Sequence, residues 1–274
     1  MASFDFHYHG KRRDVSEPAT LNLENPAAPK ITHPAQNWTK TSIEEVQKQV
    51  RVLRDRNPNA PVFGIGHSMG GAALWMAEVA NPGTFDGLIL FEPACNMHEL
   101  PNSEMIIPVY VSFILSGQYR WDSYEEAETY FRSTKAYARW HPEALAAFIQ
   151  GAVVKNEPPD YLFGIQSAYT LACHPHIEAA HYMGQPCFLS MEEMGRVRCQ
   201  VVLQYGSRTQ MFPLKASQKL AHTYPLLYRV DMPLPKATHM MITEDPDTAA
   251  ERIMSTLHQF PAFGSSTESA VPRL

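Results

Sequence analysis

The sequence has few cysteines, no excess of basic residues and no long apolar run. Its four cysteines lack C-x-x-C spacing and are too sparse for a disulfide scaffold, which points to a reducing compartment. The net charge of −5 gives no electrostatic reason to expect nucleic acid or an anionic membrane as a partner. The most apolar segment, Met105 to Leu115, is too short to span a membrane and contains a proline. These absences argue against a disulfide-rich module, a nucleic-acid-binding protein and a transmembrane protein.

The first hundred residues show the pattern of alternating strands and helices. Residues 3–10 alternate aromatic and polar side chains and end in glycine, which predicts a strand. A Pro- and Asn-rich stretch, 18–38, is predicted to be a loop, and a capping box of Ser42 and Glu45 then opens a helix. The next predicted elements are a strand at 62–66, a helix at 70–80 and a strand at 87–93. This order predicts a parallel sheet with helices on its faces.

A region with a different sequence pattern separates two sheet-forming regions. Between residues 101 and 195, helical patterns are joined by aromatic-rich segments, and no strand pattern is evident. Sheet-like segments then resume, with strands at 199–206 and 226–232 and helices at 214–221 and 247–260. An insertion of this length exceeds what a connecting loop needs. We therefore expect a core of residues 1–100 and 196–262, a helical cap of residues 101–195 and a flexible C-terminal tail of residues 263–274.

The segment Gly66 to Gly70 matches G-x-S-x-G and lies between a predicted strand and a predicted helix. This is the context of a nucleophile elbow, a strained turn whose flanking glycines let backbone segments pass closely. Ser68 is the predicted nucleophile, and the backbone N–H of Met69, at the start of the helix, is a predicted oxyanion donor. His67 is expected to line the pocket. The alternative is a glycine-rich turn that binds a phosphate or nothing.

A serine nucleophile needs a base, and His239 is the best candidate among twelve histidines. It follows the last predicted strand and precedes the last predicted helix, as the Ser–acid–His chain order of such hydrolases requires. The alternative is a histidine in a surface loop. His7 and His9, at the end of the first predicted strand, are expected to line the pocket.

The base in turn needs a carboxylate to orient it. In many such enzymes the acid follows the strand 199–206, but no Asp or Glu occurs between Glu193 and Asp231. Glu92 closes the apolar run that follows the elbow helix, where an unpaired buried carboxylate would be unfavourable. We therefore predict Glu92 as the acid, with Asp86 and Asp231 as weaker candidates. The alternative is a strand-end glutamate that faces water.

A second cluster contains Cys173, His174, His176 and His181. Its spacing fits no standard zinc pattern, and Pro175 constrains the local backbone. We interpret the segment as a joint of the cap, and we expect neither a metal nor a cofactor.

The chain resembles the α/β-hydrolases of fungal secondary-metabolite clusters, which include host-selective toxin hydrolases and the peroxisomal acyl-CoA hydrolase of mycophenolic acid synthesis. The resemblance extends from Ser3 to about Phe260 and is carried by FDFHYHG, GHSMGG, LFEPAC, WDSYEEAETYF and THMMITEDPD. It implies an α/β-hydrolase core, with a mostly parallel sheet lacking the usual first strands, and a helical cap insertion. It also implies hydrolysis of a small acyl ester or acyl-CoA thioester by Ser68, His239 and Glu92, without a cofactor.

The resemblance also implies that the chain is shortened at its N-terminus. Family members have earlier strands and a His-Gly-type loop that supplies a second oxyanion N–H, and no residue here matches it. Losing one such donor lowers the rate by about a hundredfold or more. The competing interpretation is therefore a truncated, non-catalytic binding or scaffold protein of the same fold.

The last three residues, Pro272-Arg273-Leu274, approximate the C-terminal S-K-L peroxisomal address, with proline in place of serine. Together with the peroxisomal members of the family, this ending predicts recognition by the peroxisomal import receptor. A peroxisomal location is therefore our first expectation, and a cytoplasmic location is the second.

Overall fold

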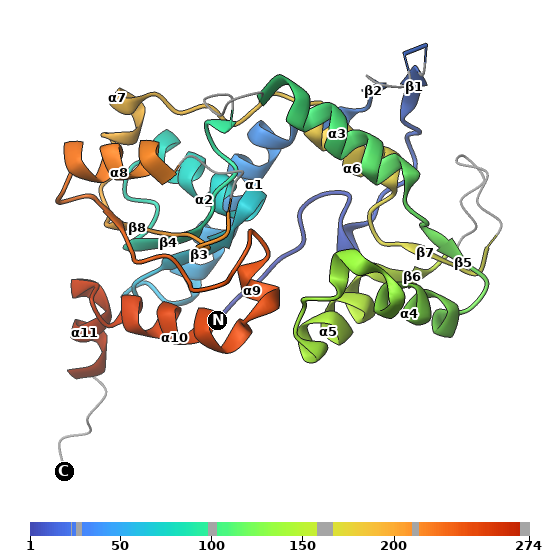
Figure 1. Ribbon diagram of the computed structural model, residues 1–274. Coiled ribbons are helices and arrows are strands. Elements are labelled where there is room, and N and C mark those ends of the chain that lie inside the picture. Colours follow the sequence, from blue (N-terminus) through green and yellow to red (C-terminus); the bar gives the residue numbers. More distant parts are fainter. Residues whose placement is uncertain (23, 26–28, 98–102, 158–166, 210–213, 269–274) are drawn as a thin grey trace. The chain divides into compact units, whose positions relative to one another are not determined.

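The computed structural model describes all residues except 23, 26–28, 98–102, 158–166, 210–213 and 269–274. The chain forms two compact units (Figure 1). The first unit contains Met1–Thr41 and Pro101–Gln185, and the second contains Ser42–Leu100 and Pro186–Leu274. No helix in the described part of the chain has both the length and the apolar character needed to cross a bilayer.

A four-stranded parallel sheet forms the centre of the second unit. Its strands, in spatial order, are β3 (Phe63–His67), β4 (Gly87–Phe91), β8 (Val201–Gln204) and β9 (Tyr228–Val230). Every neighbouring pair is parallel, as the alternation of strands and helices in the sequence predicted. The predicted fold class is thereby confirmed at the level of the sheet.

Helices cover both faces of this sheet. The helices described in this unit are α1 (Trp38–Arg56, whose first four residues belong to the first unit), α2 (Ser68–Ala80), α7 (Met191–Met194), α8 (Leu214–Thr223), α9 (Met241–Glu244), α10 (Pro246–Leu257) and α11 (Pro261–Glu268). Helices α2 and α8 lie on one face and α10 lies on the other (Figure 1). The capping box predicted at Ser42 is wrong, because α1 begins four residues earlier and buries Ser42.

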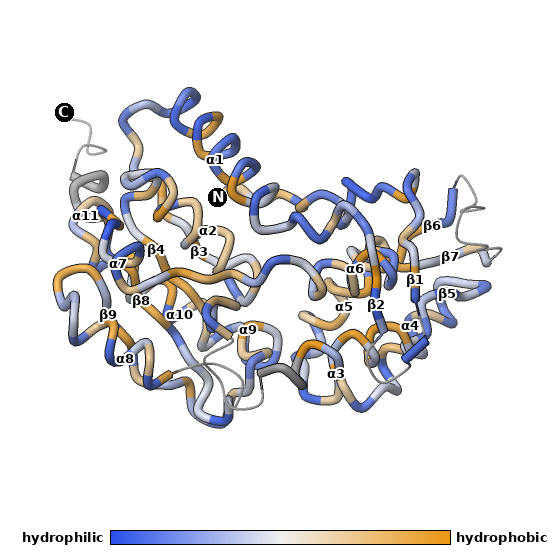
Figure 2. Tube along the Cα trace, turned by 90° about the horizontal axis from the view of Figure 1, so that it is seen from above, coloured by the Kyte–Doolittle hydropathy of each residue, from blue (hydrophilic) through white to orange (hydrophobic). Residues whose placement is uncertain are grey.

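The composition of β4 explains its central place. Leu88, Ile89, Leu90 and Phe91 are each at most 1% exposed, and β4 and β8 are hydrophobic tracts in Figure 2. Ile89 and Phe91 pack against the apolar residues of α9 and α10, while α2 lies on the opposite face. A strand covered on both faces has no polar side to show, so its sequence is continuously apolar rather than alternating.

One buried carboxylate ties α2 to the loops at the base of the sheet. Glu78 is fully buried and accepts hydrogen bonds from the backbone N–H groups of Gly83, Phe85 and Arg198, at 2.9, 3.0 and 3.0 Å. Burying a carboxylate is unfavourable unless such donors replace water. Glu78 therefore has a structural role in the second unit.

Replacing Glu78 with glutamine is expected to lower the free energy of unfolding by about 2–3 kcal/mol, because one acceptor oxygen becomes a donor facing a buried N–H. Urea unfolding followed by circular dichroism measures this change. Glu251→Gln, on the exposed side of α10, is the matched control and should change stability by less than about 0.5 kcal/mol. Equal stability of the two variants would contradict the role assigned to Glu78.

The first unit is helical with two small sheets. Its elements are η1 (Gly10–Arg12), β1 (Thr20–Asn22), β2 (Lys30–Thr32), η2 (Pro34–Asn37), α3 (Ser103–Ser116), β5 (Arg120–Trp121), α4 (Tyr124–Ser133), η4 (Lys135–Tyr137), α5 (Pro142–Ala152), β6 (Val153–Lys155), β7 (Tyr169–Leu171) and α6 (Pro175–Tyr182). The prediction of a loop at 18–38 is wrong where β1 pairs with β2. The expectation that the insertion contains no strand is wrong where β5, β7 and β6 pair. These strands are only two or three residues long, too short to produce a periodic pattern.

The strand predicted at residues 3–10 is also wrong. Tyr8 and Gly10 have φ angles of 72° and 52°, which no strand accommodates, and Gly10 begins the 3-10 helix η1. Asp5 organises this turn by accepting from the backbone N–H of Lys11 at 2.9 Å and, through its carbonyl, from the Arg12 guanidinium at 3.1 Å. Alternation of side chains is necessary for a strand but not sufficient, since a strand also needs a neighbour to pair with.

The division of the chain differs from the expected domains at both ends. Residues 1–41 group with the insertion, because Ile31 and Ala35 pack in one buried cluster with Val111, Ile177 and Ala180. At the other end, α11 continues to Glu268, so part of the expected tail is helical. The final residues 269–274, which carry the Pro272-Arg273-Leu274 ending, lie outside the described residues.

Candidate active site

The elbow is built at the junction of β3 and α2, where the strand ends at His67 and the helix begins at Ser68. Ser68 has a φ of 51°, a left-handed backbone that a non-glycine residue adopts only under constraint. A Cβ on Gly66 would lie 2.8 Å from the Gly71 Cα, so this close crossing requires glycine. At Gly70, the second glycine of the motif, an added Cβ meets nothing within 4 Å. The expectation that Gly70 permits a close backbone approach is wrong, and Gly71 has that role.

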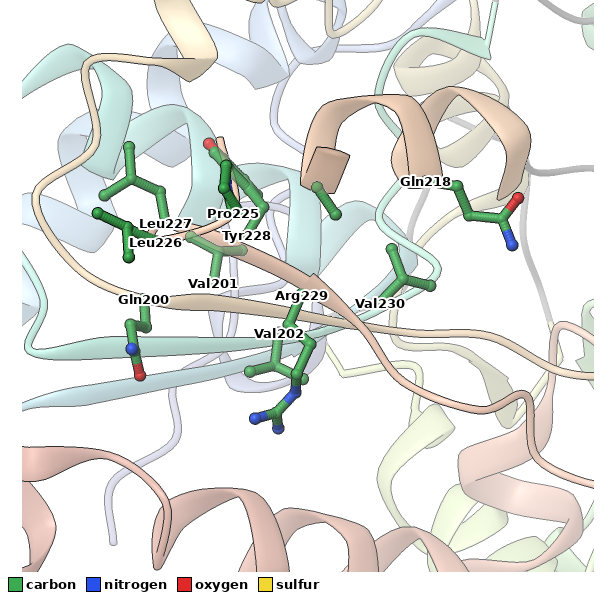
Figure 3. A pocket seen from close by; sticks show the side chains of 11 residues that line it. Gln200, Val201, Val202, Gln218, Pro225, Leu226, Leu227, Tyr228, Arg229 and Val230 are labelled. Atoms are coloured by element: carbon green, nitrogen blue, oxygen red, sulfur yellow. The ribbon is translucent and has the colours of Figure 1, made fainter. Parts of the chain in front are cut away.

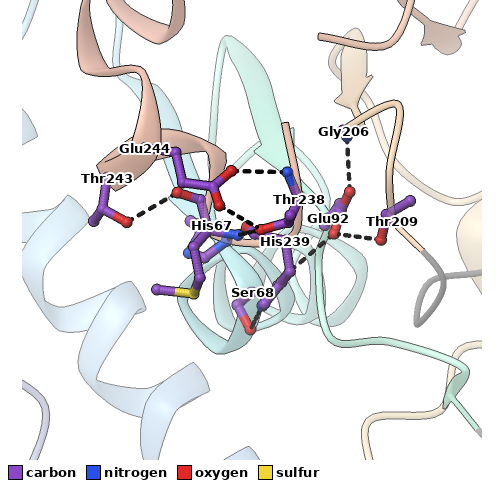
Figure 4. Close-up of polar contacts among 10 residues, drawn as sticks. His67, Ser68, Glu92, Gly206, Thr209, Thr238, His239, Thr243 and Glu244 are labelled. Atoms are coloured by element: carbon purple, nitrogen blue, oxygen red, sulfur yellow. Dashed lines mark hydrogen bonds and ion pairs between the residues drawn. The ribbon is translucent and has the colours of Figure 1, made fainter. Parts of the chain in front are cut away.

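The structure brings together the three side chains that the sequence singled out (Figure 4). The Nε2 of His239 lies 3.0 Å from the Oγ of Ser68, and its Nδ1 lies 2.9 Å from the Oε2 of Glu92. A carboxylate only accepts hydrogen bonds, so Nδ1 carries the proton and Nε2 presents a lone pair to the Ser68 hydroxyl. This tautomer allows His239 to take a proton from Ser68.

Glu92 has more than one partner in its buried position. Its side chain is fully buried, and it also accepts from the Gly206 N–H at 2.8 Å and from the Thr209 hydroxyl at 3.0 Å. Glu92 itself has a φ of 39°, so its backbone, like that of Ser68, is left-handed. Three donors to one carboxylate replace the water it has lost and hold its Oε2 against His239.

The two weaker acid candidates have other partners. Asp231 accepts from the Gln204 amide at 2.6 Å and from Arg229 at 2.7 Å. Asp86 accepts from Arg54 at 3.1 Å and from the Val62 N–H at 2.7 Å. These contacts are structural links between neighbouring segments, whereas Glu92 is the carboxylate that contacts His239.

The helix that follows Ser68 supplies a favourable electrostatic environment. Met69 is the second residue of α2, and the N–H groups of a first helical turn have no acceptor within the helix. The N-terminal end of the helix dipole also favours negative charge. These properties suit the oxyanion-donor role predicted for the Met69 N–H. The turn is anchored by the Ala94 N–H, which donates to the Ser68 carbonyl at 3.0 Å.

His67 contacts the loop of the predicted base, and its expected place in the lining of the pocket stays a prediction. Its Nε2 lies 2.7 Å from the His239 carbonyl oxygen, and the two ring centroids are 4.5 Å apart. Burial lowers the pKa of His67 to about 4, so its ring is neutral at pH 7. The sequence placed His67 beside the serine but contained no signal for this contact with a residue 172 positions away.

His7 and His9 lie in the first unit, in the turn that replaces the expected strand. His7 stacks on Tyr8 with 4.0 Å between ring centroids, and its Nε2 lies 3.4 Å from the Asp14 carboxylate. His9 packs against His181 with 5.0 Å between centroids. Their role in lining a substrate pocket stays a prediction.

The cysteine- and histidine-containing segment 173–183 forms α6 and its N-cap. His174 caps the helix by accepting from the His176 N–H, and His181 contacts the carbonyl of Ile177. Burial lowers the pKa of His174 to about 3 and that of His181 to about 4, so both are neutral near pH 7. Among the described residues, no group of three or more His, Cys, Asp or Glu side chains is placed to hold a metal ion.

Several contacts around the three side chains were not found from the sequence. The Glu244 carboxylate accepts from the N–H and the hydroxyl of Thr238, at 2.8 and 2.9 Å, directly before His239 (Figure 4). Thr209 supports Glu92 from the loop after β8. A weak signal existed for Glu244, which lies five residues after His239 in the same motif. Thr209 carried none, since only tertiary folding brings it to Glu92.

A surface hollow of about 500 Å³ lies elsewhere in the second unit (Figure 3). It is lined by Gln200, Val201, Val202, Gln218, Ala221, Pro225, Leu226, Leu227, Tyr228, Arg229 and Val230. These residues come from β8 and the residue before it, from β9 and the segment before it, and from α8. Ser68, Glu92 and His239 are not among the described residues that line this hollow, so it is no candidate for their substrate pocket.

Comparisons with known proteins relate the chain to hydrolases. Residues 34–127 match the family model described as serine aminopeptidase, S33. The chain is 26% identical over 225 residues to the peroxisomal membrane protein LPX1 of Saccharomyces cerevisiae. This match covers 77% of this chain and 56% of the yeast protein. It is 31% identical over 83 residues to a monoglyceride lipase homolog of Monkeypox virus, covering 28% of this chain and 30% of the viral protein. The chain thus spans about half of the length of the yeast relative and less than a third of the length of the viral one.

The arrangement of elements is similar to that of a solved structure. The peroxisomal alpha-beta-hydrolase Lpx1 from Saccharomyces cerevisiae superposes with a TM-score of 0.65 at 18% identity. The superposition covers 98% of this chain and 69% of that one. At this level of identity the likeness concerns the fold.

Proposed function

We propose that the chain, which has the α/β-hydrolase fold, is a serine hydrolase that cleaves an acyl ester or acyl-CoA thioester. One observation carries this proposal. The Ser68 hydroxyl lies 3.0 Å from His239 Nε2, while His239 Nδ1 lies 2.9 Å from the buried Glu92 carboxylate. A hydroxyl, an imidazole in the required tautomer and an orienting carboxylate are the three parts that activate a serine.

The proposed reaction has two halves. Ser68 Oγ attacks the acyl carbonyl as His239 Nε2 takes its proton, and Glu92 stabilises the imidazolium formed. The Met69 N–H, at the start of α2, donates to the oxyanion. His239 then returns the proton to the leaving alcohol or thiol. Water, deprotonated by His239, attacks the acyl-serine and releases the carboxylic acid, which restores the Ser68 hydroxyl.

The setting of the reaction is also part of the proposal. The resemblance to fungal toxin and secondary-metabolite hydrolases suggests an acyl intermediate of such a pathway as the substrate. A peroxisomal location is supported by the yeast relative, whose name places it in the peroxisome, and by the Pro272-Arg273-Leu274 ending. The ending would be read by the peroxisomal import receptor.

A fluorophosphonate probe tests the proposed function, because it reacts only with an activated serine. We expect the purified protein to gain one probe adduct, which peptide mass spectrometry locates at Ser68. A panel of p-nitrophenyl esters and acyl-CoA thioesters of increasing chain length then identifies the leaving group that the enzyme accepts. Folded protein that gains no adduct and cleaves neither substrate class would support the non-catalytic binding protein instead.

A further inference from the structure

We propose that His67 is a positioning residue, whose Nε2–H holds the His239 backbone carbonyl and so keeps the base aligned with Ser68. This inference deepens the proposed function and rests on it. The contact is the 2.7 Å approach between His67 Nε2 and the His239 carbonyl oxygen (Figure 4). A carbonyl oxygen only accepts hydrogen bonds, so the proton of neutral His67 must be on Nε2.

The place of His67 in the chain gives this contact its importance. His67 is the last residue of β3 and directly precedes Ser68. Its hydrogen bond therefore connects the strand that leads directly to the nucleophile with the backbone of His239, the predicted base. The hydroxyl–imidazole distance of 3.0 Å depends on these two segments keeping their separation. A displacement of about 1 Å between reacting groups lowers a rate by about a hundredfold.

A second contact holds the same loop from its other side. Glu244, at the end of α9, accepts from both the N–H and the hydroxyl of Thr238. Thr238 also accepts from the Met240 N–H at 3.2 Å. Glu244 thus holds Thr238, the residue before the predicted base, and His67 holds the backbone carbonyl of His239 itself. Glu244 and Thr238 belong to the loop and its adjoining helix, whereas His67 links that loop to the nucleophile.

The charge state of His67 suits this role. Its ring is tilted 34° from that of His239, with 4.5 Å between centroids. His239 becomes a cation during the proposed reaction, and a second cation at this distance would oppose it. Burial is the main reason that the pKa of His67 is lowered to about 4, and it keeps the ring neutral at pH 7. A neutral donor holds the base without competing with its protonation.

Two substitutions separate the hydrogen bond from the packing of the ring. His67→Phe keeps an aromatic ring but removes the donor, whereas His67→Gln can place an amide N–H near the original Nε2. We expect His67→Phe to slow fluorophosphonate labelling and to lower kcat by about 10- to 100-fold with KM little changed. His67→Gln should restore most of the loss. His222→Phe, at an exposed position of α8, is the matched control and should label at the wild-type rate.

Thermal unfolding of each variant separates positioning from stability. The proposal is supported if His67→Phe is labelled slowly by the fluorophosphonate but unfolds at the same temperature as His67→Gln. Labelling of His67→Phe at the wild-type rate would overturn it. An equal loss in both His67 variants would overturn it too, because the donor would then have no separate effect.

A spectroscopic readout tests the contact even if the protein proves not to be a hydrolase. In protein labelled with ¹⁵N-histidine, we expect the His67 ring at pH 7 to be in the Nε2–H tautomer, with assignment by comparison with His67→Gln. The Nδ1–H tautomer, or rapid exchange between the two, would contradict the proposed hydrogen bond. If wild-type protein shows the expected tautomer but resists the probe, the proposed function fails while the contact stands.

Discussion

Ser68→Ala is expected to abolish fluorophosphonate labelling and to lower kcat/KM for an acyl ester or thioester by about 10⁴-fold or more. The substitution removes the one oxygen that lies 3.0 Å from His239 Nε2. Alanine is compatible with the start of α2, although the left-handed φ of 51° at this position disfavours any residue with a Cβ. The measurement combines intact-protein mass after probe treatment with steady-state kinetics.

The loss must occur in folded protein to be informative. Far-UV circular dichroism and the thermal midpoint of Ser68→Ala should match those of the wild-type protein within a few degrees. Ser255→Ala, in α10, is a control for a serine outside the site and should leave labelling unchanged. Turnover by Ser68→Ala at the wild-type rate would refute the assignment of the nucleophile.

Glu92→Gln is expected to have the second-largest effect, a loss in kcat of about 10⁴-fold. With the side-chain NH₂ toward His239 Nδ1, the ring must accept there and carry its proton on Nε2, where it cannot take the Ser68 proton. The amide oxygen, at the Oε1 position, still accepts from the Gly206 N–H, whereas the Thr209 hydroxyl, which donates to Oε2 in the wild-type protein, loses its acceptor. Steady-state kinetics on the best ester or thioester measures the loss.

Asp231→Asn is the matched control for the position of the acid. Asp231 lies near the end of β9 and is held by Gln204 and Arg229, so its substitution should reduce kcat by less than about threefold. Activity that survives Glu92→Gln but is lost in Asp231→Asn would place the acid at Asp231. The unfolding midpoint of each variant shows whether a loss of activity is a loss of fold.

The local parts of the site could be predicted because their patterns are short. The motif from Gly66 to Gly70 combines a strand end, a turn and a helix start within a few residues, and the structure has β3, the turn and α2 there. Glu92 was predicted because an apolar run that ends in a carboxylate needs a partner for it. Its buried oxygens do have partners, in His239, Gly206 and Thr209. The catalytic roles of these residues stay predictions.

The predictions that are wrong concern features that depend on distant residues. Residues 3–10 alternate like a strand, but they form a turn held by Asp5. The segment 1–41 was assigned to the core, yet Ile31 and Ala35 are buried against α3 and α6. The alternation at residues 3–10 suggested a strand, and the Pro- and Asn-rich stretch 18–38 suggested a loop. Which surface those positions would meet was not encoded locally.

Hydrophobic order along the chain by itself determined the parallel sheet and the helices on its faces, because periodicity reports which positions are buried. The glycine motif determined the turn that presents Ser68. Only tertiary structure decided the contacts across 147 to 172 residues: Glu92 and Ser68 on the two sides of the His239 ring, and His67 on its carbonyl. The physical reason is that a hydrogen bond forms over about 3 Å with a defined direction, so it depends on the placement of whole elements. Apolar burial has no direction and can be read from composition and spacing alone.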